Sequence, residues 1–112
     1  MLELSLTDKR CVPCEGGVPR LSPERVEELL KEIPGWEAPQ QHHLYRVFRF
    51  PDFKQGLDFV NRAGEIAEQE GHHPDLLLAW GRVEVTVFTH SIDGLSENDF
   101  VLAAKIGQLY TP

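Results

Sequence analysis

The chain has 112 residues, of which 41% are hydrophobic and 26% charged, a composition typical of one globular domain. Its 18 acidic and 11 basic side chains give a formal net charge of −7, and no cluster of Lys and Arg offers the surface that nucleic-acid phosphates require. No run approaches the roughly 18 apolar residues of a membrane span, and the N-terminus lacks a signal-peptide pattern. We therefore expect a cytoplasmic protein without a direct nucleic-acid or membrane partner.

Residues 1–21, rich in Pro and Gly, are predicted to form an irregular N-terminal arm, and residues 22–112 the domain itself. Ser22 as N-cap and Pro23 at the first helical position begin the first predicted helix, which Pro34-Gly35 ends. The spacing of its apolar residues predicts a buried stripe of Val26, Leu29, Leu30 and Ile33.

Residues 43–50 are rich in aromatic and β-branched types and are predicted to form a strand. Asp52 can cap a second helix over residues 52–70, with Gly71 as the residue just beyond its end. The predicted inward face of this helix is Phe53, Leu57, Val60, Gly64 and Ala67, with Phe59 and Ile66 off that stripe.

Leu76 to Trp80 are predicted to form a short strand, and Gly81-Arg82 a two-residue hairpin turn with Gly at its first central position. The next strand alternates from Val83 to His90, with Val83, Val85 and Val87 on one side and Glu84, Thr86, Phe88 and His90 on the other. Ser96 caps a final helix, whose predicted face is Phe100, Ala103, Ala104 and Gly107. The order α-β-α-β-β-α indicates a single α+β domain, an antiparallel sheet with helices packed on one face.

Three histidines are candidates for chemistry. His72 and His73 follow the helix terminator Gly71, and His90 lies at the far end of the hairpin's second strand. Because an antiparallel hairpin returns its second strand to the start of the first, His90 is expected near the other two. Imidazole titrates near neutrality, so such a cluster can hold one protonated and one neutral member. On spacing alone, however, a His-His pair at a helix–strand junction is more often a cap or a surface feature.

A longer motif favours a catalytic role for these histidines over a capping or surface role. It consists of Glu70-Gly71-His72-His73-Pro74, then Trp80, Thr89-His90 and Gly94-Leu95-Ser96-Glu97-Asn98-Asp99. Together these segments resemble the signature of the pterin-4a-carbinolamine dehydratase family, in which two adjacent histidines and a proline, an aromatic residue, a third histidine and a later aspartate recur in this order. The resemblance extends over residues 22–109 and is strongest to bacterial members. Leu76-Leu77-Leu78-Ala79 replaces a more aromatic and polar stretch of the animal members. The resemblance therefore does not extend to the wall of the pocket or to the choice of pterin side chain.

The resemblance implies an enzyme that removes water from 4a-hydroxytetrahydrobiopterin to give quinonoid dihydropterin, with no metal and no organic cofactor. It implies catalytic roles for His72, His73 and His90, the first and last as acid and base and His73 chiefly in binding the pterin. The implied substrate-binding set is His72, His73, Pro74, Thr89, His90, Ser91 and Ile92. The family resemblance also implies a homotetramer, with a homodimer as the simpler alternative.

Two supporting residues have competing interpretations. Asp99 completes a capping box with Ser96, which favours a role as a helix cap over a role in positioning the loop that carries His90. Trp80 could stack on the pterin, but packing at the hairpin tip, away from the histidines, is the favoured interpretation.

Two other functions are open. Animal members of the family also serve as dimerisation cofactors of a transcription regulator, which would require an exposed apolar helical face. Phe59 and Ile66 could form such a face, but self-association of the chain would use them equally well. Cys11 and Cys14 suggest half of a zinc site. His42 and His43 show no ligand-like spacing to them, so two reduced cysteines in the arm are the simpler interpretation.

Overall fold

The computed structural model describes residues 5–11 and 19–110. Within them the helices are α1 (Pro23–Leu30), α2 (Phe53–Glu70) and α3 (Glu97–Gly107), and the strands are β1 (Leu44–Arg49), β2 (Asp75–Ala79) and β3 (Arg82–Val87). Short 3-10 turns, η1 (Leu6–Asp8), η2 (Pro39–Gln41) and η3 (His90–Ile92), complete the described elements. The predicted order and the α+β class are confirmed. No helix among these residues is long and apolar enough to cross a membrane.

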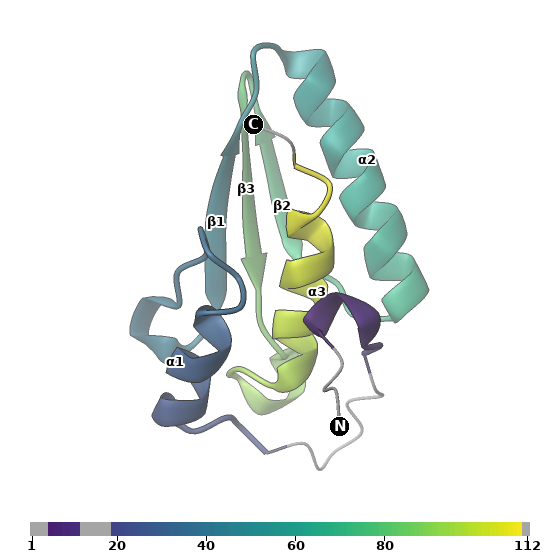
Figure 1. Ribbon diagram of the computed structural model, residues 1–112. Coiled ribbons are helices and arrows are strands. Elements are labelled where there is room, and N and C mark those ends of the chain that lie inside the picture. The colour runs from purple at the N-terminus through teal and green to yellow at the C-terminus, as the bar shows by residue number, and fades with distance from the viewer. Residues whose placement is uncertain (1–4, 12–18, 111–112) are drawn as a thin grey trace.

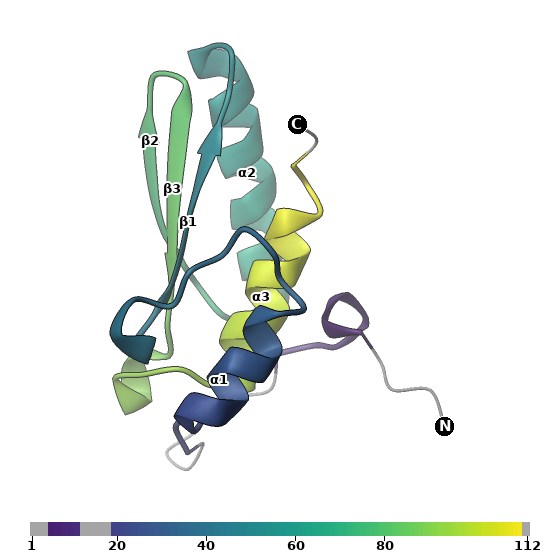
Figure 2. The same cartoon turned by 60° about the vertical axis from the view of Figure 1, so that its left-hand side comes forward.

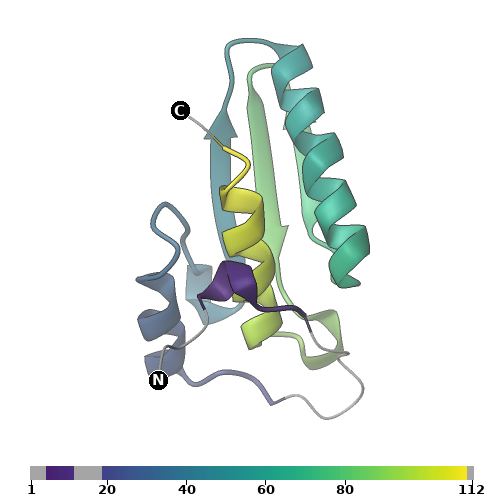
Figure 3. The same cartoon turned by 45° about the vertical axis from the view of Figure 1, so that its right-hand side comes forward.

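The sheet is antiparallel with the order β1-β3-β2, so the last strand in sequence lies in the middle. Helices α2 and α3 cover one face of it (Figures 1 and 2). The predicted alternation of β3 holds, because Val83, Val85 and Val87 are fully buried under these helices while the residues between them face outward. Turning the molecule shows α3 and the N-terminal η1 in front of the sheet (Figure 3).

Helix α1 begins as predicted, with the Ser22 side chain accepting a hydrogen bond from the Arg25 backbone N–H. It ends at Leu30, before the predicted stop at Pro34. The chain continues in tighter turns, in which the N–H groups of Glu32 and Ile33 bond three residues back. Ile33 is still buried, so the predicted apolar stripe extends past the helix that was expected to carry it.

The buried face of α2 differs from the prediction. Phe53 and Leu57, placed on the inward stripe, are 45% and 40% exposed, whereas Phe59, placed off it, is 4% exposed. The stripe that packs on the sheet is Gly56, Phe59, Ala63 and Ala67. At Gly56 an added Cβ would lie 3.0 Å from Leu78, so small residues let the helix approach β2 closely while Phe59 packs against Phe48 and Phe50.

The hairpin turn is shifted by one residue from its predicted position. Ala79 pairs with Arg82, so Trp80 and Gly81 form the turn. Gly81 has φ +71°, and a Cβ there would lie 3.1 Å from the Phe50 carbonyl oxygen, which explains why glycine occupies the position. At its other end β3 stops at Val87, so His90 lies in η3 instead of the strand.

The described part of the N-terminal arm packs on the domain. Leu6 in η1 is buried in the core, Lys9 pairs with Glu97, and the Cys11 backbone N–H donates to Glu70 at 2.8 Å. Helix α3 is correspondingly buried on more than its predicted face, from Asn98 through Ala103 and again at Ile106.

Candidate active site

The three predicted histidines line one pocket. It encloses about 290 Å³ and is lined by Gly71, His72, His73, Thr89, His90 and Ser91. Helix α2 ends at Gly71, which has φ +67°, and this left-handed residue turns the chain into the His72-His73 link. Asp75 at the start of β2 pairs with Thr86 near the end of β3, so the segments before and after the hairpin meet at the same end of the sheet.

His72 is buried, and its Nε2 lies 2.6 Å from Asp99 Oδ1. A carboxylate can only accept, so the proton of a neutral His72 sits on Nε2. The lone pair is then on Nδ1, the nitrogen that can take a proton. A carboxylate behind an imidazole also stabilises the imidazolium that proton transfer creates.

Asp99 is fully buried and serves three groups. Its Oδ1 faces His72, while its Oδ2 accepts hydrogen bonds from the Thr89 hydroxyl and the Ser96 backbone N–H, both at 2.8 Å. The capping box predicted from sequence is present at the start of α3. One carboxylate therefore performs both capping and positioning. It caps the start of α3, orients His72 and holds Thr89, the residue before His90, by a hydrogen bond.

His73 is in a different environment. Its side chain is 60% exposed and pairs with Glu68, which is 77% exposed. A solvent-exposed ion pair of this kind constrains a side chain only weakly. Of the two adjacent histidines, the first is thus buried against a carboxylate, and the second is largely exposed to solvent.

His90 is exposed and lines the same pocket. Its ring packs on Phe88, with ring centroids 4.1 Å apart. Backbone hydrogen bonds between Thr89 and Gly94 close the loop that contains it. Ser91, in the same loop, also lines the pocket.

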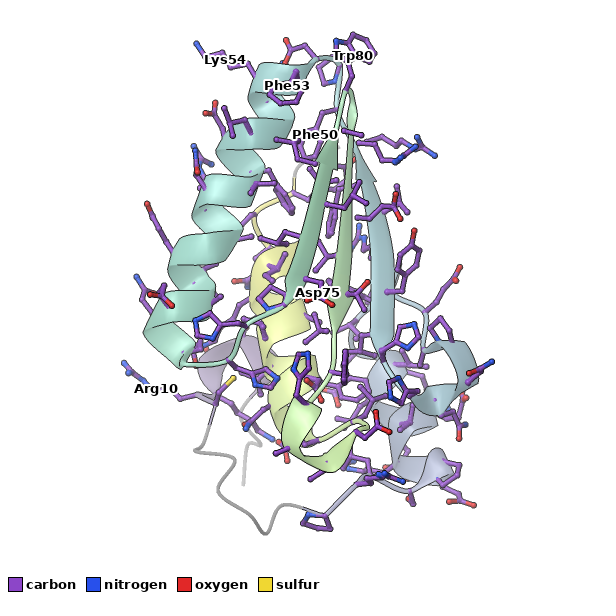
Figure 4. All side chains as sticks on the ribbon, turned by 180° about the vertical axis from the view of Figure 1, so that it is seen from behind. Arg10, Phe50, Phe53, Lys54, Asp75 and Trp80 are labelled. Carbon is purple, nitrogen blue, oxygen red and sulfur yellow. The ribbon has the colours of Figure 1, made fainter. Side chains whose placement is uncertain are left out.

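Not every predicted site residue reaches this pocket. Of the described residues, Pro74 and Ile92 lie outside its lining. Trp80 is 74% exposed, which is contrary to its predicted packing. It lies with Phe53 at the end of the molecule where α2 begins, away from Asp75 and the start of β2 (Figure 4).

The zinc alternative finds no support in the part of the chain that the structure describes. No group of three or more His, Cys, Asp or Glu side chains there could hold a metal ion. Cys11 is half-buried, with its thiol 3.5 Å from the Asn98 carbonyl oxygen, and Cys14 lies outside the described residues.

Sequence analysis missed two residues next to the histidines. Glu68, the partner of His73, could not be recognised from the sequence, because it lies within α2 while His73 lies beyond the end of that helix. Phe88, the support of His90, was placed on the same side as His90 by the strand's alternation, and that pattern could have identified it.

The fold and the pocket define a small α+β protein with a histidine-lined site suited to proton transfer. A family model described as Pterin 4 alpha carbinolamine dehydratase matches residues 19–109. This chain belongs to that family.

Individual relatives agree with the family match. A protein of Rubrobacter xylanophilus is 59% identical, with 93% of this chain and 97% of the relative covered, and one of Halorhodospira halophila is 50% identical, with 95% and 98% covered. Both carry the name "Putative pterin-4-alpha-carbinolamine dehydratase". A solved structure from Brucella melitensis, described as a transcriptional coactivator/pterin dehydratase, has a TM-score of 0.77 and 34% identity, covering 81% of this chain and 98% of that one.

Proposed function

We propose that this chain is a 4a-hydroxytetrahydrobiopterin dehydratase that works by histidine acid/base catalysis. The observation that carries the proposal is the pocket that a carboxylate-backed, buried His72 shares with an exposed His90, in a chain whose relatives are named for this activity. The two imidazoles differ in environment, which is the condition for one to act as base and the other as acid.

The proposed reaction needs two proton transfers. His72 accepts the proton of the ring nitrogen next to the carbinol carbon, through Nδ1, and Asp99 stabilises the imidazolium that results. His90, protonated, donates to the hydroxyl, the carbon–oxygen bond breaks with its electron pair on oxygen, and water leaves. The nitrogen's electron pair forms the double bond of the quinonoid product. His90 is exposed and regains a proton from solvent, and His72 releases the proton it accepted before the next turnover. Because proton transfer alone drives the loss of water, the proposed step uses no metal or redox cofactor.

His73 is proposed to bind the pterin. Its exposure and its weakly held partner Glu68 leave it free to turn toward a ring edge. Thr89 and Ser91 offer hydroxyl groups at the pocket wall. Pro74 and Ile92 then act through the backbone of the two segments that form the pocket.

The test uses glutamine variants, because His72→Ala would leave the buried Asp99 without one of its donors. His72→Gln can still donate to Asp99 but cannot take a proton at neutral pH. A positioned acid or base contributes roughly 10²- to 10⁴-fold, so His72→Gln and His90→Gln are each expected to lower kcat by about 10²-fold or more. His73→Gln is expected to raise KM with kcat nearly unchanged.

Lys54→Gln, on the exposed start of α2, is the control and is expected to retain full activity. Turnover is measured as disappearance of 4a-hydroxytetrahydropterin, and folding by circular dichroism. A His72→Gln/His90→Gln double variant that is folded and turns over as fast as the wild type would refute the proposal.

A second function, binding of a transcription regulator, is favoured by one feature. Phe53 and Leu57 point outward from α2 and expose apolar surface, although the residues predicted for this role, Phe59 and Ile66, pack against or within the core. Phe53→Ser/Leu57→Ser separates the functions, because it is expected to keep kcat and to abolish any helix-mediated partner binding. If this variant loses turnover but keeps its assembly state, the helical face serves the enzyme and the second function is wrong.

A further inference from the structure

The loop that carries His90 is held by residues that belong neither to the pocket nor to the hairpin. The Arg20 Nε donates to the Ile92 carbonyl oxygen at 2.6 Å, and His42 Nε2 lies 2.7 Å from Asp93 Oδ1. Arg20 precedes α1 and His42 precedes β1, so two segments that are distant in sequence both form hydrogen bonds to the same loop. Asp93 adopts the left-handed conformation, φ 47° and ψ 52°, which an Asp tolerates better than most residues.

The surroundings of His42 favour a fixed orientation of its ring. Its Nδ1 lies 3.1 Å from Nδ1 of His43, so one of these two nitrogens must donate and the other accept. Burial, and then the neighbouring His42, lowers the pKa of His43. The Asp93 carboxylate can only accept, so Nε2 of His42 carries the proton of the hydrogen bond between them. The same hydrogen bond and the charge of His42 lower the pKa of Asp93, with Arg20 adding to the effect.

The ring of His42 also reaches His90 through an intervening aromatic ring. His42 packs on Phe88 with centroids 4.9 Å apart, and Phe88 packs on His90 at 4.1 Å. Phe88 therefore contacts both imidazoles. Movement of His42 would remove the support behind the ring on which His90 rests.

We propose that His42 is a positioning residue for His90: its hydrogen bond to Asp93 fixes the loop, and its packing on Phe88 supports the ring beneath His90. The inference rests on the proposed catalytic role of His90. The groups facing His42 are Asp93 and, across Phe88, His90 from the loop, with His43 from its own segment and Arg20 beyond Asp93.

The effect is local and not a contribution to the stability of the whole fold. The His42 and Asp93 side chains are 36% and 76% exposed, and ion pairs this exposed stabilise a protein little. Small displacements of a catalytic group nevertheless reduce turnover strongly. The expected signature is lower kcat with an unchanged melting temperature.

The experiment compares four variants. His42→Ala loses both the hydrogen bond and the packing, and Asp93→Gly loses the carboxylate but accommodates the left-handed backbone. His42→Gln keeps a donor near the position of Nε2. Arg25→Ala removes another exposed ion pair, Arg25–Glu28, on α1, and serves as the matched control.

We expect His42→Ala to lower kcat by about 3- to 10-fold with little change in KM. Asp93→Gly is expected to lower it less, His42→Gln to recover most of the loss, and Arg25→Ala to match the wild type. In the double variant His42→Ala/Asp93→Gly, kcat is expected to equal that of His42→Ala alone, because the two changes break the same bond.

A second readout does not require dehydratase activity. The NMR signals of the His90 ring are expected to shift or broaden in His42→Ala and Asp93→Gly but not in Arg25→Ala, and the Asp93 pKa to rise toward its ordinary value in His42→Ala. If the wild type fails to dehydrate the pterin, the proposed function falls while the NMR result still decides the positioning role. Unchanged His90 signals in His42→Ala, or additive losses of kcat in the double variant, would overturn the inference.

Discussion

Replacing Asp99 with Asn tests the central contact of the site. The amide is nearly isosteric with the carboxylate but offers only one acceptor oxygen. Kept at the position of Oδ2, that oxygen still accepts from Thr89 and the Ser96 N–H, and the NH₂ group then points at His72. Two donors cannot face each other, so the proton of a neutral His72 must move from Nε2 to Nδ1. The nitrogen that is proposed to take the proton of the pterin is then no longer a base.

Asp99→Asn is expected to lower both the free energy of unfolding and kcat, the second far more strongly than the first. Hydrogen bonds to a charged group contribute about 1.5–3 kcal/mol against about 0.5–1.5 for neutral ones. Asp99 is fully buried, so solvent does not reduce the difference, and we expect a loss of about 1–3 kcal/mol in the free energy of unfolding. For turnover, the wrong tautomer removes a positioned base, with an expected fall of about 10²- to 10⁴-fold in kcat.

Ser96→Ala is the control, because it weakens the helix cap and leaves Asp99 facing His72. It is expected to cost about 1 kcal/mol of stability while kcat stays close to the wild-type value. Stability is measured by urea denaturation and turnover by loss of the carbinolamine. A folded Asp99→Asn protein with wild-type kcat would refute the role assigned to this contact.

Further predictions concern stability and assembly. Gly81→Ala, forced to φ +71° with its Cβ 3.1 Å from the Phe50 carbonyl oxygen, is expected to destabilise the fold by about 1–3 kcal/mol in thermal unfolding. Burial by itself raises the pKa of Glu70, but hydrogen bonds from Lys105 and the arm outweigh it, so the net pKa is lowered. The stability that this lowered pKa contributes is present above the ordinary pKa of about 4.3 and is lost as the pH falls through the pKa of Glu70 in the folded protein. Glu70→Gln should therefore make the free energy of unfolding less sensitive to acid. The same pH dependence in the variant and the wild type would contradict this. The chain is expected to form a homotetramer or homodimer in light scattering, because the apolar edge strand β2 can pair with a second copy. In that assembly Trp80 should be protected from a fluorescence quencher. A monomer at micromolar concentration would contradict the predicted assembly.

Local signals explain what could be predicted about the fold. Ser22, Asp52 and Ser96 begin helices because a side-chain oxygen accepts a backbone N–H two or three residues on, an interaction that needs no distant partner. Gly71 ends α2 for a similarly local reason, since it adopts a left-handed conformation at low cost. The alternation of β3 and the convergence of the three histidines follow from the geometry of one strand and one hairpin.

Two of the predictions that were wrong, the buried face of α2 and the packing of Trp80, depended on distant contacts. Which face of α2 is buried depends on how closely the helix can approach β2, and Gly56 and Ala63 allow an approach that an apolar pattern does not reveal. The exposure of Trp80 likewise depends on where α2 begins relative to the hairpin tip.

The sequence by itself determined the order of the elements, their beginnings and the presence of histidines at one end of the sheet, because each of these follows from interactions within a few residues. The tertiary structure alone decided how the histidines differ. His72 and Asp99 are separated by 27 residues, and His42 and Asp93 by 51. These contacts form only when α3 and the segment before β1 pack against the hairpin, since packing and not local geometry decides which distant polar groups come into contact.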